Sequence, residues 1–129
     1  MASGLVTTES DRLVNASLGV VAYTAPTTPM KLSIHSTTSS ASAVGTEASG
    51  GSYARQSLAF TTASGGTGVS NTGVVSFTNM PAGTWLNANI WDSAGTPRRE
   101  WFGDLTASKT TASGDTLSFA VGAITVNDN

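Results

Sequence analysis

The sequence predicts a mainly β protein, a single β-sandwich or jelly-roll-like domain with a short N-terminal helix or arm. Hydroxyl residues supply much of its polarity, with 20 Thr and 18 Ser, and there are 14 Gly. Thr favours strands, whereas Ser and Gly favour turns. Short stretches of alternating apolar and polar residues recur at roughly ten-residue spacing with turn signals between them, which is typical of a sandwich. With 129 residues and 39% apolar content, the chain is large enough for one buried core.

Residues 1–25 are predicted to form an N-terminal arm or short helix. Within them, residues 9–18 are the only helix candidate, with Ser10 as its N-cap and Leu13 and Val14 toward one side. An isolated helix of this length is only marginally stable in water. We therefore expect this helix to need a surface on which to lie.

Residues 26–129 are predicted to form the sandwich. The first strand, residues 30–35, alternates cleanly and places Leu32 and Ile34 inward. The same alternation places His35, the only histidine of the chain, on the outer face as a surface residue.

A turn at Gly50-Gly51 leads into the second predicted strand, residues 52–62. Arg55 is the one charged residue in that strand, so we expect it to be a paired structural or interface arginine. The remaining strands are expected at residues 74–78, 85–92 and 98–105, around 117–119 and around 124–126.

Three tryptophans, Trp85, Trp91 and Trp101, admit three interpretations. They form a core or inter-sheet cluster, a contact between subunits, or a platform on which sugars stack. In the predicted strand 85–92, Ala88 and Ile90 face inward with Leu86, whereas Trp85 and Trp91 share the other face.

Three carboxylates, Asp92, Glu100 and Asp104, lie close together in the sequence. Paired carboxylates carry out glycoside hydrolysis, and positions 100 and 104 share one face of a strand. The favoured interpretation is that these acids pair with Arg98 and Arg99 on a solvated edge or at a subunit contact. We therefore expect no catalytic residues and no enzyme.

Composition excludes several classes of protein. The absence of cysteine rules out disulfides, thiolate catalysis and Cys-based zinc sites. One histidine and eight dispersed acids make a metal site or cofactor unexpected. A net charge of −2 with scattered basic residues argues against nucleic acid as a partner. The apolar stretch at residues 18–23 is too short to cross a membrane, and no signal peptide is visible.

Several short runs occur in a fixed order along residues 10–127, at 22–28, 45–56, 90–92, 102–106, 109–110 and 113–119. The most specific is Ser-Tyr-Ala-Arg-Gln, which begins at Ser52. Together the runs resemble a family of small phage virion proteins, often labelled tail-fibre-like, found among phages of actinobacteria and other bacteria. The resemblance implies a phage particle component with a β-rich fold and no known chemistry.

Within that resemblance, the first expectation is a capsid decoration protein, of the cement or minor capsid type, on the outside of the shell. Its partners would be the major capsid protein and other copies of itself, as a trimer or other homo-oligomer. The alternative is a tail-fibre or tail-tip protein that binds host surface glycans. Either protein would be made in the host cytoplasm and end on the particle surface. The candidate interface residues are Leu13, Val14, Tyr53, Arg55, Trp91, Arg98, Arg99 and Trp101.

Overall fold

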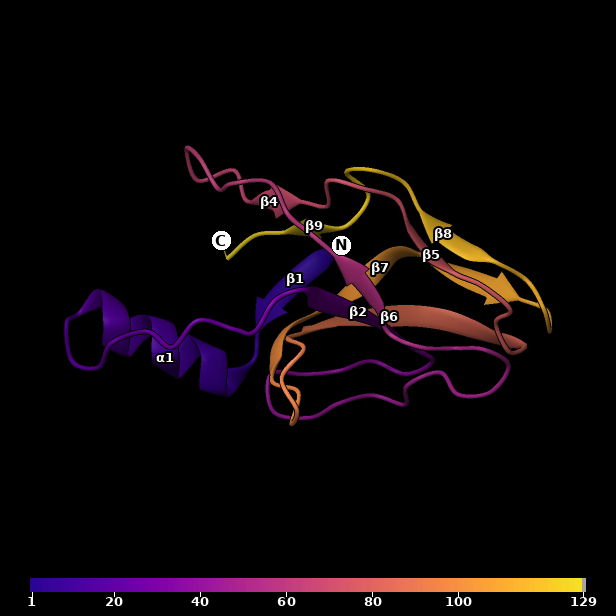
Figure 1. Cartoon of the computed structure of the whole chain (residues 1–129), viewed down its shortest axis with the longest axis horizontal. Coiled ribbons are helices and arrows are strands. Elements are labelled where there is room, and N and C mark those ends of the chain that lie inside the picture. The colour runs from indigo at the N-terminus through magenta and orange to yellow at the C-terminus, as the bar shows by residue number, and fades with distance from the viewer. Residues whose placement is uncertain (129) are drawn as a thin grey trace.

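The computed structural model describes residues 1–128, which form one helix and nine strands (Figure 1). The elements in chain order are β1 (Ala2–Leu5), α1 (Thr7–Ser17), β2 (Met30–His35), β3 (Gln56–Leu58), β4 (Val69–Ser70), β5 (Val75–Phe77), β6 (Gly83–Trp91), β7 (Arg99–Thr111), β8 (Leu117–Phe119) and β9 (Thr125–Val126). The prediction of a mainly β fold with one short N-terminal helix is confirmed.

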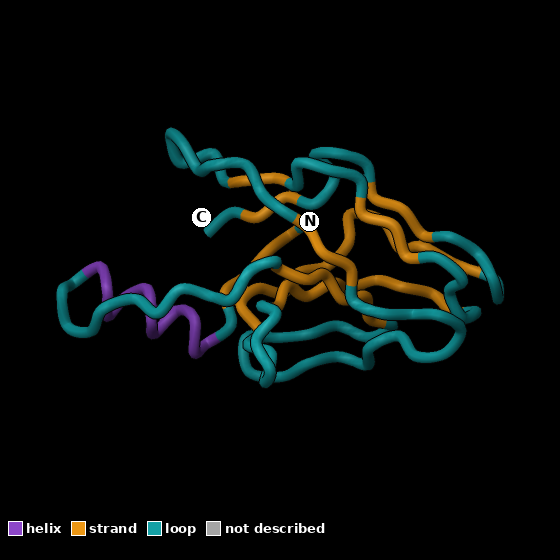
Figure 2. Tube along the Cα trace, in the orientation of Figure 1, coloured by secondary structure: helices purple, strands orange, loops and turns teal. Residues whose placement is uncertain are grey.

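The strands form three antiparallel sheets (Figure 2). The large sheet has the order β1-β7-β6-β2-β3, and two small sheets pair β4 with β9 and β5 with β8. All of these strand pairs are antiparallel. In the large sheet Leu32 lies opposite Ile90, and in the β5–β8 sheet Val75 lies opposite Phe119. The small sheets provide the second layer that covers one face of the large sheet.

The core lies between these layers. Leu32, Ile34 and Ile90 enter it from the large sheet, and Phe77 and Phe119 enter it from the β5–β8 pair. The two phenylalanine rings meet edge to face, with centroids 6.5 Å apart. This geometry is favourable for aromatic pairs. The inward positions predicted for Leu32 and Ile34 are confirmed, because both are fully buried.

Strand β6 departs from the predicted alternation at its start. Ala88 and Ile90 face the core as expected, but Trp85 is also in the core and is only 4% exposed, whereas Leu86 is half-buried. The pairing with β7 shifts register between Trp85 and Asn87. An irregularity of this kind changes which face the preceding residues occupy. The predicted outward position of Trp85 is therefore wrong.

Helix α1 begins at Thr7, three residues before the predicted N-cap, so Ser10 lies inside it. The residue before the helix, Val6, makes no side-chain cap. Instead the backbone fixes the start: the N–H of Val6 donates to the carbonyl of Glu100, and that of Thr7 donates to Ala41. Tertiary hydrogen bonds, absent from any local sequence pattern, thus satisfy two of the backbone donors that have no partner within the helix.

The arm stands away from the β layers. Figure 1 shows α1 pointing outward from the body, with the chain of residues 18–28 returning beside it. Its base is held by β1, a strand that the sequence analysis does not predict, which pairs with β7 from Ala2–Asp104 to Leu5–Trp101. Beyond its base, α1 therefore packs against the returning segment and not against the β layers.

Strand β3 is shorter than the predicted strand at residues 52–62, since only Gln56–Leu58 pairs with β2. The turn predicted at Gly50-Gly51 is present, and both residues have positive φ. A Cβ on Gly51 would lie 2.2 Å from the carbonyl oxygen of Asn79, so a larger residue cannot fit there.

Candidate functional site

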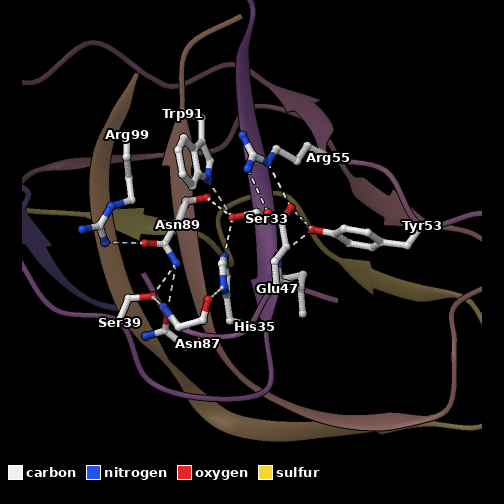
Figure 3. A network of polar contacts seen from close by, with 12 residues as sticks. Ser33, His35, Ser39, Glu47, Tyr53, Arg55, Asn87, Asn89, Trp91 and Arg99 are labelled. Carbon is white, nitrogen blue, oxygen red and sulfur yellow. Dashed lines mark hydrogen bonds and ion pairs between the residues drawn. The ribbon is translucent and has the colours of Figure 1, made fainter. Parts of the chain in front are cut away.

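A layer of polar side chains covers the face of the large sheet that points away from the core (Figure 3). His35 lies within it and is fully buried, so its predicted surface position is wrong. Its Nδ1 is 3.0 Å from the carbonyl oxygen of Gly45, and its Nε2 is 2.7 Å from Ser33 Oγ. Because a carbonyl only accepts, Nδ1 carries the proton and the Ser33 hydroxyl donates to Nε2. Burial lowers the pKa of His35, which favours this neutral form.

Two asparagines of β6 continue the layer toward β7. Asn89 Nδ2 donates to Asn87 Oδ1 at 3.1 Å and to Ser39 Oγ at 2.9 Å. Arg99 Nη1 donates to Asn89 Oδ1 at 2.9 Å, and Asn87 Nδ2 donates to Asp104 Oδ1 at 2.9 Å. Arg99, a candidate interface residue, is therefore buried in its own chain, only 8% exposed. It pairs with an amide and not with a carboxylate.

At the edge of this layer, Glu47 binds two further candidate interface residues, Tyr53 and Arg55. Arg55 donates to both of its carboxylate oxygens, at 3.0 Å from Nε and 2.8 Å from Nη2. Tyr53 donates its hydroxyl to Oε2 at 2.9 Å and accepts the backbone N–H of Ile34 at 3.0 Å. Arg55 also lies 3.8 Å from the ring centroid of Trp91, a cation–π distance. Arg55 is thus a paired structural arginine, one of the two roles expected for it.

The polar layer holds the loop of residues 36–55 against the sheet. The sequence analysis missed Glu47, Ser33 and the two asparagines of β6. Polar residues alternate with apolar ones on both β2 and β6, and this alternation is the sequence pattern that could have identified Ser33 and the asparagines. It indicates a polar layer only when the register is known, because the register places Ser33 opposite Asn89 and His35 opposite Asn87. In this layer the polar groups bind one another, so its chemistry is structural.

A second charged cluster lies at the base of the arm. Glu9, the one buried residue of α1, accepts hydrogen bonds from Arg12 at 3.0 Å and from the Tyr23 hydroxyl at 2.5 Å. Arg98 reaches Glu9 at 3.6 Å and also pairs with Glu100, as the sequence indicated. These contacts join the helix and its return segment to the start of β7.

The pKa of Glu100 is raised in this cluster. Burial and the hydrogen bond with Glu9 raise its pKa to about 7, although Arg98 opposes the shift. For Glu9, burial acts in the same direction, but hydrogen bonds with Glu100, Tyr23 and Arg12 outweigh it and lower the pKa. The two carboxyl groups therefore share one proton near neutral pH, with Glu100 as the protonated partner.

The three acids considered for catalysis have different surroundings. Glu100 lies at the arm base, whereas Asp104 lies in the polar layer beside Asn87. Asp92 accepts backbone N–H groups from Arg98 at 2.7 Å and Thr27 at 3.1 Å. Within residues 1–128, no three metal-ligating side chains come together.

The tryptophans do not form one platform. Trp85 is in the core, and its indole N–H donates to Thr111 at 2.8 Å. Trp91 lies in the polar layer, where it donates to Ser33 at 2.8 Å. Trp101 is opposite Ile90 in the sheet register and packs against the core side of the same sheet. Trp91 and Trp101 therefore lie on opposite faces.

Trp101 lines a cleft beside the β4–β9 pair. The cleft has a volume of about 190 Å³, and Val69, Asn127 and Asp128 also line it. A second hollow of about 490 Å³ shares Val69 and Asn127 and is lined by hydroxyl residues. Those hydroxyl residues are Thr61, Thr62, Thr67, Ser70 and Thr125. An indole, an amide, a carboxylate and several hydroxyl residues thus lie around one small sheet.

The arm carries a different kind of surface. Val14, Leu18, Val20 and Val21 are between 53% and 73% exposed, and Leu13 is 37% exposed. From Leu13 to Met30 the sequence contains no charged residue. Leu13 and Val14, both candidate interface residues, are therefore part of an exposed, uncharged, apolar surface. Among the described residues, no helix has the length and apolar character needed to span a bilayer.

The chain matches the family described as Podophage GP4 fiber I protein gp80, over residues 4–127. No curated protein matches it. The resemblance read from the sequence is confirmed at the level of a phage fibre-like virion family. Because the match covers nearly the whole chain, the protein belongs to the family of the podophage GP4 fibre I protein gp80 and is a structural component of a phage virion.

Proposed function

We propose that this chain is a host-contacting module of a phage fibre, which binds sugars of the bacterial surface at the Trp101 cleft. The observation that carries the proposal is the half-buried indole of Trp101, set beside Asn127, Asp128 and the hydroxyl-lined hollow. Membership of a fibre family supports it, because phage fibres act at the particle surface.

The chemistry of the cleft suits a saccharide. An aromatic ring offers a flat apolar surface to the C–H face of a sugar, while amide, carboxylate and hydroxyl groups hydrogen-bond its hydroxyls. Trp101 packs against the core, so its ring is fixed before a ligand arrives. A fixed ring reduces the entropy lost on binding. The hydroxyl-lined hollow of about 490 Å³ lies within the size range of small-molecule sites, roughly 300–1,000 Å³, and the Trp101 cleft beside it is smaller, about 190 Å³.

A glycan array of bacterial surface saccharides, with a cell-wall pull-down, tests this proposal. The wild-type chain should bind a subset of saccharides, and Trp101→Ala should weaken that binding at least about tenfold, since the stacking surface is lost. Val121→Ala, at an exposed residue that does not line the cleft, is the matched control and should bind as the wild type does. A wild-type chain that binds neither the array nor the cell wall would refute the proposal.

A capsid decoration protein is the second candidate. The observation that favours it is the compact β body with a single projecting arm, which suits many copies clamped to a symmetric shell. Adding purified chain to phage heads stripped of it tests this candidate. Saturable rebinding to the shell would support it, whereas binding only at the tail would exclude it.

A further inference from the structure

The arm is joined to the body through the charged cluster between α1, its return segment and the start of β7. Among the described residues, the hydrogen bonds and ion pairs that connect residues 8–26 with the β layers all end on Arg98 or Glu100. Arg98 lies 3.6 Å from Glu9 of α1 and donates to the carbonyl oxygen of Thr24 at 3.0 Å, so it contacts both segments of the arm. The orientation of the arm (Figure 1) therefore depends on this cluster.

The centre of the cluster is a pair of buried carboxyl groups. The side chains of Glu9 and Glu100 are each 3% exposed, and the two are hydrogen-bonded to one another. Ionised carboxylates only accept hydrogen bonds, so a bond between two of them requires a proton on one. Glu100 Oε2 is buried and accepts no hydrogen bond from any described residue. Arg12 lies 3.7 Å from it, beyond hydrogen-bond length. This oxygen is therefore the one that can carry the shared proton.

The proton joins two different parts of the molecule, because Glu9 belongs to α1 and Glu100 to β7. Without it the hydrogen bond between the carboxyl groups is lost, and two adjacent carboxylates repel each other across the contact between arm and body. We propose that this carboxyl pair is a proton-dependent clasp, which fixes the arm against the body while the proton is present and releases the arm when the proton leaves.

Glu100 is the member of the cluster that titrates near neutral pH. Burial and the hydrogen bond with Glu9 raise its pKa to about 7. The neighbours that face it keep their charge states in this range. Burial and Glu9 raise the pKa of Tyr23 to about 12, and the pKa of Glu9 is lowered because its hydrogen bonds outweigh burial. Asp92, on the far side of Arg98, has a lowered pKa because backbone N–H groups outweigh burial. Both arginines of the cluster stay cationic.

Docking of the arm should weaken as pH rises. In the docked arm the pKa of Glu100 is about 7, whereas in a released arm the carboxyl group lies in water and returns to its ordinary value of 4.5. The docked state therefore holds the proton more tightly, and its advantage is complete below about pH 4.5 and is lost as pH rises through 7. Between pH 5 and pH 8 the ratio of released to docked arms should rise roughly 10- to 100-fold.

Hydrogen exchange of the full-length chain, followed by NMR at pH 5 and pH 8, tests the clasp. A free helix of 11 residues is only marginally stable in water, so release of the arm also opens the backbone of α1. The measured quantity is the protection factor, in which the ordinary pH dependence of exchange cancels. For amides of α1 it should fall roughly 10- to 100-fold from pH 5 to pH 8. Amides of Ala88 and Ile90, fully buried in β6, should stay more protected at both pH values, because they exchange only when the body unfolds.

Three variants separate the clasp from other effects. Glu100→Gln keeps a neutral group that can donate to Glu9, so the protection factor of α1 should be equal at both pH values. Glu9→Gln removes the neighbouring negative charge, so the fall should become smaller. Asp11→Asn, at an exposed acid of the same helix, is the matched control and should show the full fall. Circular dichroism checks that each variant folds.

Three results would overturn the inference. The first is a wild-type protection factor in α1 that does not change between pH 5 and pH 8. The second is a fall that persists unchanged in both Glu100→Gln and Glu9→Gln. The third is equal protection of α1 and β6, which would show that arm and body open together and that the arm has no clasp of its own.

Discussion

Tyr53 connects three parts of the chain through its hydroxyl and its ring. It accepts the N–H of Ile34 at a point on β2 where β3 no longer pairs, and it donates to Glu47 in the covering loop. Its ring stacks on Phe77 in the core, with centroids 5.7 Å apart. The Ser-Tyr-Ala-Arg-Gln run is therefore structural: Tyr53 completes the edge of the sheet, and Arg55 binds the same carboxylate.

Replacing Tyr53 by Phe should destabilise the fold by about 1–3 kcal/mol, because the buried N–H of Ile34 loses its acceptor and Glu47 Oε2 loses one of its two donors while the ring stays. Urea unfolding of the wild type and of Tyr53→Phe measures the difference. Ser57→Ala, at an exposed position in β3, is the control and should change stability by less than about 0.5 kcal/mol. Equal stability of Tyr53→Phe and wild type would contradict the assigned role.

His35 should remain neutral at a pH below that at which a free histidine titrates. Its pKa is lowered by burial, so as pH falls through about 6.5 the unfolded chain binds a proton and the folded chain does not. The contribution of His35 to stability is therefore complete above that pH and declines below it. Nitrogen NMR of the imidazole should show the Nδ1–H tautomer. A midpoint at or above 6.5 would show that the ring is not buried in this way.

At the scale of elements, the junction between α1 and β7 depends on one shared proton. Glu100 occupies a register irregularity of β7, since Trp91 pairs with Arg99 and Ile90 pairs with Trp101. A bulged residue can point away from its neighbours. Here it points its carboxylate toward Glu9 at the arm base, where burial keeps it protonated near neutral pH.

Glu100→Gln should change how the stability of the chain depends on pH. The pKa of Glu100 is raised to about 7, so its folded form retains a proton between about pH 4.5 and 7 that the unfolded form releases. The stabilisation is complete below about pH 4.5 and is lost as pH rises through 7. Gln is always neutral, so the free energy of unfolding of the variant should not fall in this way. On going from pH 5 to pH 8, the variant should therefore gain about 1–3 kcal/mol in free energy of unfolding relative to wild type. Thermal unfolding at both pH values measures this, and a pH-independent difference would contradict it.

The elements that follow local patterns could be predicted from the sequence. The alternation in β2 correctly placed Leu32 and Ile34, and the two glycines correctly marked a turn. Strand β1 has only four residues and no such pattern, and it forms because β7 offers it an edge. The face of Trp85 depends on a register irregularity, which no single strand reveals.

The site was harder to predict for the same reason. The alternation of β2 alone could not show that a loop covers its outer face, so His35 looked exposed. Glu47 lies in a loop of small residues, and only the folded chain brings it to Tyr53 and Arg55. Trp101 could be predicted as a candidate binding residue because it is a tryptophan. Its cleft could not be predicted, because the β4–β9 pair, which is distant in the sequence, forms the other side.

At the scale of the whole molecule, the chain separates three tasks. The polar layer and the core hold the body together, the arm exposes an uncharged apolar surface, and the Trp101 cleft is the surface that we propose for sugars. The arm base and Trp101 lie at the same end of β1 and β7, because Leu5 pairs with Trp101 and the N–H of Val6 donates to the carbonyl of Glu100. Under the proposed role, several copies carried on one particle would bind a bacterial surface together and gain avidity.

Cryo-electron microscopy of the intact phage particle, with this chain fitted into the density, tests the proposed role most directly. We expect its density in the fibres, with the Trp101 cleft facing solvent. Density confined to the capsid shell, with the Trp101 cleft buried against other subunits, would contradict a role in contact with the host.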